Sequence, residues 1–193
     1  VCEGTVVEFG ARKNSTKNFT NFIKIKNSDK IIFADKINNN EDTLFQDLED
    51  KLSFKNETID TVLIFNVLEH VYDVNNSFKE ITRCLKSNGK IIGSTPFIHR
   101  IHNAPGDFNR YTPQFIEKIL KKNNYTNINV EELGFGPFTA AYSIIFDTTK
   151  KIPILNNIIL MTTLILDNII SLFVKTKLKK IYPITICFSA DKK

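Results

Sequence analysis

The feature that most constrains this fold is an alternation of short apolar runs with segments of helical periodicity. The clearest run, 59–65, carries consecutive apolar residues where a strand with one exposed face would alternate. Such runs are typical of strands buried on both faces of a parallel sheet. Residues 74–85 follow with apolar side chains at helical spacing. This order predicts an α/β sheet with helices on both faces.

The rest of the chain supplies further strands and helices in the same order. The predicted strands are 5–9, 31–34, 43–45, 59–65, 90–94, 127–133 and 181–190. Ser15 or Thr16 can cap a helix after the first strand, and Thr112 caps another that runs to about Lys122, with Pro113 in its first turn. Asn88 and the glycine after it predict a turn before the strand 90–94.

Polar and small residues follow several of these strands directly. In open α/β sheets, ligands bind beyond the carboxyl ends of the strands. The residues at that edge are Gly10, Asp35, Asp47, Asn66 and Pro96. We therefore expect the functional site to lie among them.

Three of these positions have a chemistry of their own. Gly10 lets the backbone approach a ligand, but no G-x-G-x-x-G loop follows, which counts against NAD or FAD. Asp35 can accept hydrogen bonds from two ribose hydroxyls, and Asp47, beside Leu48, can accept one from an adenine amino group. The structural alternatives are a turn, a solvated loop acid and a helix or turn cap.

Two segments carry a family resemblance. Residues 59–71, IDTVLIFNVLEHV, resemble the FDxVxxxxVLEHV segment of type 11 S-adenosylmethionine-dependent methyltransferases of class I. Residues 85–96 resemble the LKPGGxLxxSTP segment of the same family, in the right order and spacing. The resemblance extends from about Thr5 to Leu133, and the last strand fits it as well.

The resemblance implies a fold, a cofactor and site residues. The fold is a Rossmann-like three-layer α/β sandwich with a mostly parallel seven-stranded sheet and an antiparallel last strand. The cofactor is S-adenosyl-L-methionine. Glu8 and Gly10 would lie against its methionine part, Asp35 against the ribose, Asp47 and Leu48 against the adenine, and Asn66 and Val67 near the methyl group. Glu69 and His70 belong to the family pattern and would mainly orient their loop.

The sequence departs from the family in two places. Arg12 stands where family members carry a second small residue, so its side chain would either crowd the cofactor or pair with the cofactor's carboxylate. The third strand is short, and the helix that usually follows it is missing. Both departures bear on cofactor affinity more than on fold.

The loop 99–113 is the expected acceptor side of the site. It resembles the H-x-x-P-x-D-[YF]-x-R-[YF]-T-P pattern of a subgroup of these enzymes, several of them encoded among bacterial surface-glycan genes. We expect His99, Arg110 and Tyr111 to bind substrate, and His102 or Asp107 to take a proton from the attacking group. In the structural alternative, 105–107 form a turn and Asp107 fixes Arg110.

An apolar insertion at about 135–180 precedes the last strand. Residues 152–174 are long enough to cross a bilayer, but an Asp at the centre of a spanning helix is costly. Asn156, Thr163, Asp167 and Ser171 lie on one stripe, which favours an amphipathic helix. It could pack on its own domain, form a homodimer contact, or lie on an anionic membrane through the region 152–180 and its lysines.

Charge and cysteine content narrow the remaining classes. The net charge of +5 is concentrated in 175–193, where six lysines face one aspartate, so the rest of the chain is neutral and we expect no nucleic-acid partner. Three cysteines without C-x-x-C spacing predict neither a disulfide framework nor a metal site. These features favour a cytoplasmic protein, with peripheral contact at the inner face of a membrane as an option.

The resulting hypothesis is one methyltransferase domain over 1–193, with an N-terminal segment expected to precede Val1. It would methylate a small molecule or a glycan- or lipid-linked intermediate, at oxygen in preference to other atoms. The alternative is a catalytically inactive, methyltransferase-like binding or partner subunit, which Arg12 and the shortened third-strand region favour.

Overall fold

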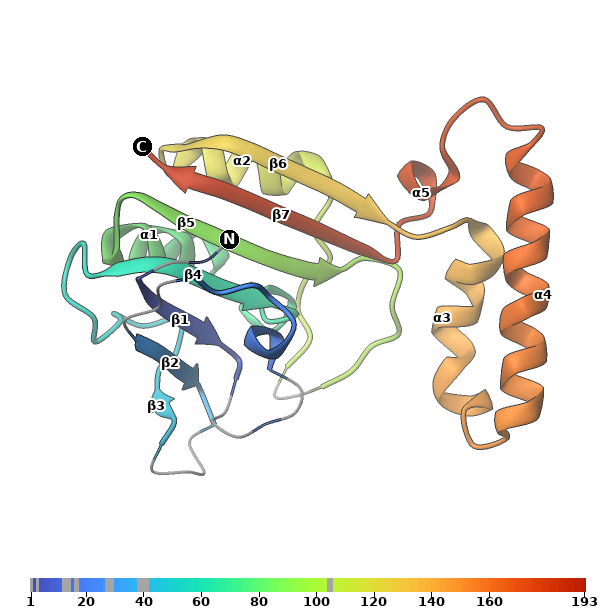
Figure 1. Cartoon of the computed structure of the whole chain (residues 1–193), viewed down its shortest axis with the longest axis horizontal. Coiled ribbons are helices and arrows are strands. Elements are labelled where there is room, and N and C mark those ends of the chain that lie inside the picture. The colour runs from blue at the N-terminus through green and yellow to red at the C-terminus, as the bar shows by residue number, and fades with distance from the viewer. Residues whose placement is uncertain are drawn as a thin grey trace.

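The chain forms one seven-stranded sheet with the order β3-β2-β1-β4-β5-β7-β6 (Figure 1). The computed structural model describes residues 2, 4–11, 15, 18–26, 30–37, 42–103 and 106–193. The strands are β1 (Thr5–Phe9), β2 (Lys30–Asp35), β3 (Leu44–Phe45), β4 (Ile59–Phe65), β5 (Leu85–Pro96), β6 (Tyr125–Leu133) and β7 (Thr185–Lys192). Strands β1 to β5 pair in parallel, and β7 runs antiparallel between β5 and β6. The predicted fold class, with its antiparallel last strand, is confirmed.

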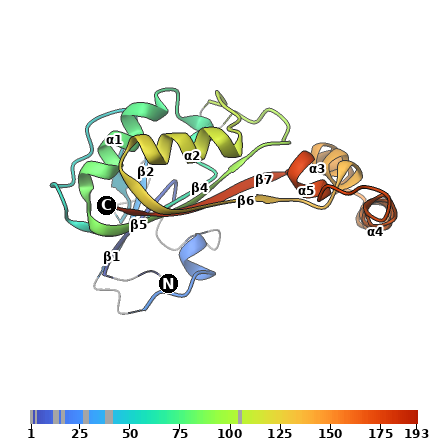
Figure 2. The same ribbon diagram turned by 90° about the horizontal axis from the view of Figure 1, so that it is seen from above.

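Two helices cover one face of this sheet and form the main core with it. Helix α1 (Val74–Cys84) and helix α2 (Pro113–Lys122) lie side by side above the strands in Figure 2. Phe78 and Ile81 of α1 and Ile116 and Leu120 of α2 are fully buried, each contributing roughly 1.5–3 kcal/mol. Helix α2 begins as predicted, because the Thr112 hydroxyl accepts a hydrogen bond from the Phe115 amide.

The helix predicted after the first strand is wrong for the residues that the structure describes. Thr16, one of its two proposed caps, lies outside them. The segment forms only a 3-10 turn, Phe19–Asn21, and Phe22 beyond it is 77% exposed. The buried Glu8 carboxylate accepts hydrogen bonds from the Phe19 and Thr20 amides at 2.7 and 3.2 Å, which fixes the turn on β1.

The largest differences from the predicted strand boundaries are at the starts of β5 and β7. Strand β5 begins at Leu85, so the turn predicted at Asn88 lies inside the strand. There Asn88 has a φ of +63°, and the pairing of β4 with β5 shifts its register. The last strand begins at Thr185 where 181 was predicted, because a short helix, α5 (Leu178–Ile181), occupies the preceding residues. Its closing hydrogen bond runs from the Tyr182 amide to the Leu178 carbonyl, so the strand can begin only after Pro183.

The apolar insertion folds into a helical hairpin beyond the end of the sheet (Figure 1). It consists of α3 (Pro137–Thr149) and α4 (Pro153–Ser171). The carboxylate of Asp167, buried in α4, accepts hydrogen bonds from the Phe138 and Thr139 amides at 3.0 and 2.9 Å and from the Thr139 hydroxyl at 2.7 Å. The side-chain amide oxygen of Asn156 accepts hydrogen bonds from the Tyr142 and Thr149 hydroxyls. These two residues of the predicted polar stripe therefore face α3.

We expect Asp167→Ala to destabilise this hairpin, because three donors of α3 lose a charged acceptor. The free energy of opening should fall by about 2–4 kcal/mol. Hydrogen exchange of the α3 amides measures it directly. The control is Asn168→Ala, which alters an exposed neighbour. Equal protection of α3 in both variants would contradict the proposed role of Asp167.

Candidate functional site

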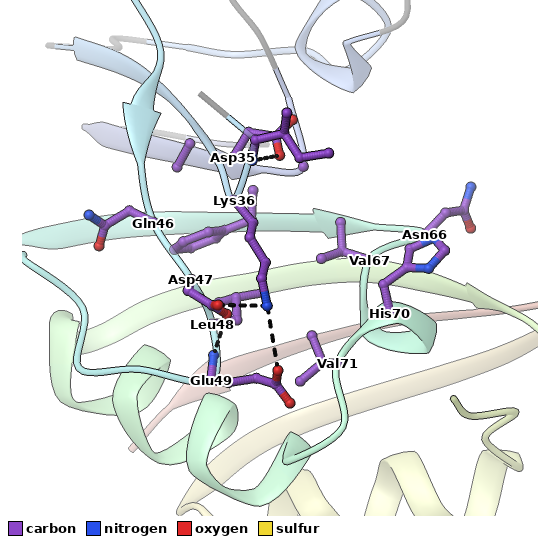
Figure 3. A pocket seen from close by; sticks show the side chains of 14 residues that line it. Asp35, Lys36, Gln46, Asp47, Leu48, Glu49, Asn66, Val67, His70 and Val71 are labelled. Atoms are coloured by element: carbon purple, nitrogen blue, oxygen red, sulfur yellow. Dashed lines mark hydrogen bonds and ion pairs between the residues drawn. The ribbon is translucent and has the colours of Figure 1, made fainter. Parts of the chain in front are cut away.

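The carboxyl ends of β1, β2, β3 and β4 surround a cavity of about 240 Å³, here called the first cavity (Figure 3). Its walls come from strand ends and from the turn after β4, as expected for an open α/β sheet. Six of the seven residues predicted for the cofactor line it: Gly10, Asp35, Asp47, Leu48, Asn66 and Val67. Residues 35, 47 and 66 lie far apart in sequence, and the parallel sheet brings them together.

Two residues with positive φ shape the floor of this cavity. Gly10 has a φ of +72°, and a Cβ added to it would lie 2.4 Å from Cγ2 of Val67, so a side chain is excluded on two grounds. Asn66 has a φ of +53°, a conformation that Asn adopts more readily than most residues. Its amide donates to the Ser94 carbonyl at 2.9 Å, and the Ser94 hydroxyl donates to its side chain at 3.1 Å. These two hydrogen bonds fix the backbone of Asn66 beside the cavity.

The acidic residues of the first cavity are already engaged within the chain. Asp35 accepts a hydrogen bond from the Ile37 amide at 2.9 Å. Lys36 extends toward Asp47 and Glu49, with its Nζ 2.7 Å from one carboxylate and 3.6 Å from the other (Figure 3). The hydrogen bond to Asp47 raises the pKa of the Lys36 ammonium. Sequence reasoning missed Lys36, although its position directly after Asp35 was a usable signal.

Glu8 occupies a different place from the one predicted. It lines a neighbouring cavity of about 390 Å³, which shares Phe9, Gly10 and Asp35 with the first cavity. Both of its carboxylate oxygens accept backbone hydrogen bonds from the 3-10 turn. Glu8 therefore fixes the wall beside Gly10, and its contact with a cofactor stays a prediction. Arg12 lies outside the described residues.

A larger cavity of about 640 Å³, the second cavity, opens on the other side of Asn66. Asn66 lines both cavities. The wall of the second cavity toward the sheet is polar and contains Glu69, His99 and His102, whereas the hairpin contributes mostly apolar side chains, among them Tyr142 and Phe146. This contrast suits a ligand with a polar reacting end and an apolar body.

Of the predicted acceptor-binding residues, only His99 lines the second cavity. Burial, together with the nearby His102, lowers the pKa of the His99 imidazole. Tyr111 is buried in the main core and stacks on Phe115, and Arg110 pairs with Asp107. The predicted substrate roles of Arg110 and Tyr111 are therefore corrected to structural ones.

Asp107 holds the loop between β5 and α2. Its buried carboxylate forms a two-point ion pair with Arg110 and accepts a hydrogen bond from the His102 amide at 2.9 Å. The Arg110 guanidinium holds the pKa of the Asp107 carboxyl well below its usual range. Such a carboxylate is a poor proton acceptor, so the role predicted as the alternative, in which Asp107 fixes Arg110, is the one that the structure supports.

His102 lies where a reacting group can meet it. Its side chain is 25% exposed and lines the second cavity, with Nδ1 3.4 Å from the Asp107 carboxylate and Nε2 3.9 Å from Glu69. Nε2 of His70 lies 3.8 Å from the same Glu69 oxygen. Glu69 is fully buried, and this burial raises the pKa of its carboxyl to about 7. Its carbonyl oxygen also accepts hydrogen bonds from the Phe108 and Asn109 amides, which fits the predicted role of this segment in orienting the loop.

Comparison with known proteins accounts for this geometry. Residues 8–93, which contain the strands and turns around the first cavity, match the model of the type 11 methyltransferase domain family. The matched segment, 8–93, is similar to the class I, type 11 methyltransferases. No curated protein matches the chain in sequence.

Solved structures share the fold of this chain at low sequence identity. A phosphoethanolamine N-methyltransferase 2 of Haemonchus contortus, in complex with S-adenosyl-L-methionine, is 16% identical with a TM-score of 0.60 over 99% of this chain and 49% of that one. A SAM-dependent methyltransferase of Archaeoglobus fulgidus is 14% identical with a TM-score of 0.62, over 99% and 86%. The CurJ carbon methyltransferase is 12% identical with a TM-score of 0.57, over 97% and 48%.

These neighbours act on different atoms. The chain spans about half the length of the phosphoethanolamine methyltransferase chain. The neighbours include an N-methyltransferase and a carbon methyltransferase, so a shared fold does not fix the atom that is methylated.

We expect Asp107→Asn to destabilise the protein by about 2–4 kcal/mol, because it leaves the Arg110 guanidinium without its charged partner. Urea unfolding followed by circular dichroism measures this loss. Asp147→Asn is the matched control, since it removes an exposed pair with Arg100 and should leave the unfolding midpoint nearly unchanged. Similar midpoints for the two variants would show that the buried pair does not hold the loop.

Proposed function

We propose that this protein catalyses methyl transfer from S-adenosyl-L-methionine to an oxygen atom of a small molecule or of a glycan- or lipid-linked intermediate. The observation that carries the proposal is the meeting of two cavities at Asn66. The first has the features of a cofactor site, and the second joins a polar wall to an apolar one. A methyl donor and an acceptor placed in these cavities would meet beside one residue.

The first cavity suits the cofactor in shape and in polar groups. Gly10 brings the backbone close to it without a Cβ, and Asp35 lies at the end of β2, where ribose hydroxyls can reach its carboxylate. Asp47 and Leu48 would border the adenine, and Asn66 and Val67 the methyl end. The cofactor supplies a methyl group already activated on a sulfonium, so positioning contributes much of the rate. Lys36 would have to share Asp47 with an adenine amino group.

Transfer to oxygen fits the polar wall of the second cavity. The acceptor oxygen forms a bond to the methyl carbon, the carbon–sulfur bond breaks with its electron pair left on sulfur, and the acceptor hydroxyl loses its proton. We propose that this proton leaves at the cluster of Glu69, His70 and His102, with His102 the member nearest to an acceptor. The apolar wall of α3 and α4 would hold a lipid or other apolar part of the acceptor.

The cofactor proposal predicts binding of S-adenosylhomocysteine that depends on Asp35. We expect micromolar binding by calorimetry, and a loss of at least about tenfold in Asp35→Ala, because the ribose hydroxyls lose a charged acceptor. Asp50→Ala removes an exposed carboxylate in the segment after β3, and this variant should bind S-adenosylhomocysteine like the unchanged protein. A folded protein that binds no S-adenosylhomocysteine would overturn the proposal.

The inactive alternative gives a different pattern. A binding or partner subunit would bind S-adenosylhomocysteine, or nothing, and would transfer no label from methyl-labelled S-adenosylmethionine to glycan, lipid-linked or small-molecule acceptors. Label found on nitrogen or carbon of the product would refute the oxygen assignment while leaving the methyltransferase activity in place.

We further propose that the protein acts at the anionic, cytoplasmic face of a membrane and docks there through the hairpin. Apart from Asp167, the described residues of α4 are not buried: Asp167 and Asn156 face α3, and many of the apolar side chains of α4 are exposed. Helix α4 is long and apolar enough, by length and composition, to cross a bilayer. The outward apolar residues are Ile144, Ile145, Ile154, Leu155, Ile158, Met161, Ile165, Ile169, Leu172 and Phe173.

The positive charge at the two ends of α4 favours an anionic membrane as the partner of its exposed apolar face. Lys150 and Lys151 lie at one end of α4, and Lys175 and Lys177 follow its other end, all of them exposed. Cations at both ends of an apolar helix complement anionic lipid headgroups when the helix lies along the surface. Asp167, turned toward α3, remains away from the lipid in that orientation. A second copy of the chain would place these lysines against each other.

Vesicle flotation tests the docking face. We expect binding to phosphatidylglycerol-containing vesicles that weakens as salt rises, and little binding to phosphatidylcholine alone. The double variant Ile158→Asp/Ile165→Asp, which places charge on the outward face, should stay unbound. Phe22→Asp alters an exposed apolar residue elsewhere and should bind normally.

Three results would contradict the docking proposal. The unchanged protein could remain unbound at low salt. The double variant could instead abolish a dimer seen by light scattering, which would assign the face to a second copy. Resistance to alkaline carbonate extraction would indicate a spanning helix.

A further inference from the structure

Three side chains with metal-binding atoms converge between the two cavities. They are Glu69 and His70, in the turn after β4, and His102, in the loop after β5. One donor atom from each lies within 4.8 Å of the other two. His70 lines the first cavity, whereas Glu69 and His102 line the second. The cluster therefore lies where the two cavities meet.

The spacing of the three groups is too wide for hydrogen bonds between them. The Glu69 oxygen lies 3.8 Å from Nε2 of His70 and 3.9 Å from Nε2 of His102. Two ligand atoms that are each about 2.1 Å from one metal ion lie roughly 3.0–4.2 Å apart, depending on the angle between them. A tetrahedral ion needs about 3.4 Å between its ligand atoms. Both distances from Glu69 are about 0.5 Å longer than that, and the third pair, which lies within 4.8 Å, must close by up to about 1.5 Å.

The Glu69 carboxyl group is buried without a partner for its oxygen atoms in the described part of the chain. Its side chain is fully buried, and neither carboxylate oxygen has a hydrogen-bond partner among the described residues. A buried carboxylate without donors is costly, so native structures satisfy such a group with a partner or an ion. The neighbouring guanidinium of Arg110 is already bound to Asp107.

The two imidazoles are oriented as metal-binding histidines are. Nδ1 of His70 donates a hydrogen bond to the Gly106 carbonyl, and Nδ1 of His102 faces the Asp107 carboxylate at 3.4 Å. The hydrogen bond at His70 keeps the proton on Nδ1 and leaves Nε2 with a lone pair, whereas Nδ1 of His102 is near Asp107 without a hydrogen bond among the described residues. Both Nε2 atoms face Glu69. One carboxylate and two imidazole nitrogens thus converge on one point.

We propose that Glu69, His70 and His102 form a binding site for a divalent first-row metal ion of the Zn²⁺ type. Two imidazoles and one carboxylate are a ligand set that such ions accept, with further positions left open. The open positions would face the second cavity, which Glu69 and His102 line. If the proposed function is right, a cation there would lower the pKa of an acceptor hydroxyl, and its proton would pass to solvent, because His102 would then be a ligand of the ion and could not accept that proton.

Calorimetric titration of the tag-free, chelator-treated full chain with ZnCl₂ tests the site. We expect one ion per chain, and an affinity at least about 100-fold weaker in Glu69→Gln and in His102→Gln, because each variant loses a ligand. His99→Gln is the matched control: its ring stacks on His102, but it contributes no atom to the cluster. It should bind zinc within about threefold of the unchanged protein.

A second readout reports the ligands themselves. Titration with CoCl₂ should give visible absorption bands that Glu69→Gln and His102→Gln both lose. No saturable zinc binding would overturn the site. Zinc binding that survives Glu69→Gln would also overturn the site, because Glu69 would then not be a ligand of the ion. An equal loss in His99→Gln would indicate a nonspecific imidazole site.

Binding of S-adenosylhomocysteine separates this inference from the proposed function. Glu69→Gln and His102→Gln should both keep S-adenosylhomocysteine binding if they are folded. If one of them loses it, the metal site is tested with the other variant and with the cobalt absorption bands. Zinc binding without S-adenosylhomocysteine binding would refute the proposed function and leave the metal site standing. The reverse result would refute the metal site alone.

Discussion

The turn at the carboxyl end of β4 is the constraint on which the rest of the site depends. Asn66 leaves the sheet with a positive φ and is held to Ser94 of β5 by a backbone and a side-chain hydrogen bond. That turn places Val67 against Gly10 on one side and directs Glu69 toward the second cavity on the other. One pair of neighbouring parallel strands therefore supports both halves of the proposed reaction.

The loop after β5 completes the site through one buried ion pair. Asp107 binds Arg110 and also accepts the His102 amide, so the same carboxylate fixes the fold of the loop and the position of an imidazole. The loop is further attached to the turn after β4, where the Glu69 carbonyl accepts hydrogen bonds from Phe108 and Asn109. The two segments that carry the cluster Glu69, His70 and His102 are thus packed as one unit.

The hairpin shows the opposite arrangement to a core helix. Its polar residues Asp167 and Asn156 satisfy donors of α3, and many apolar residues of α4 are exposed on the side away from α3. An exposed apolar face of this extent marks an interaction surface. The same hairpin forms the apolar wall of the second cavity, which would connect a membrane-borne acceptor with the site.

Local sequence determined the strands, because buried parallel strands need consecutive apolar residues, as in 59–65. It also determined most of the first cavity, since Gly10, Asp35, Asp47 and Asn66 all follow strands that meet at one edge. Only the tertiary structure decided which partners the polar groups have. Glu8 accepts hydrogen bonds from a turn, Asp47 pairs with Lys36, and Asp107 pairs with Arg110. It also brought His102 to Glu69, and it turned the polar stripe of α4 inward. These contacts join residues distant in sequence, and local periodicity carries no information about such partners.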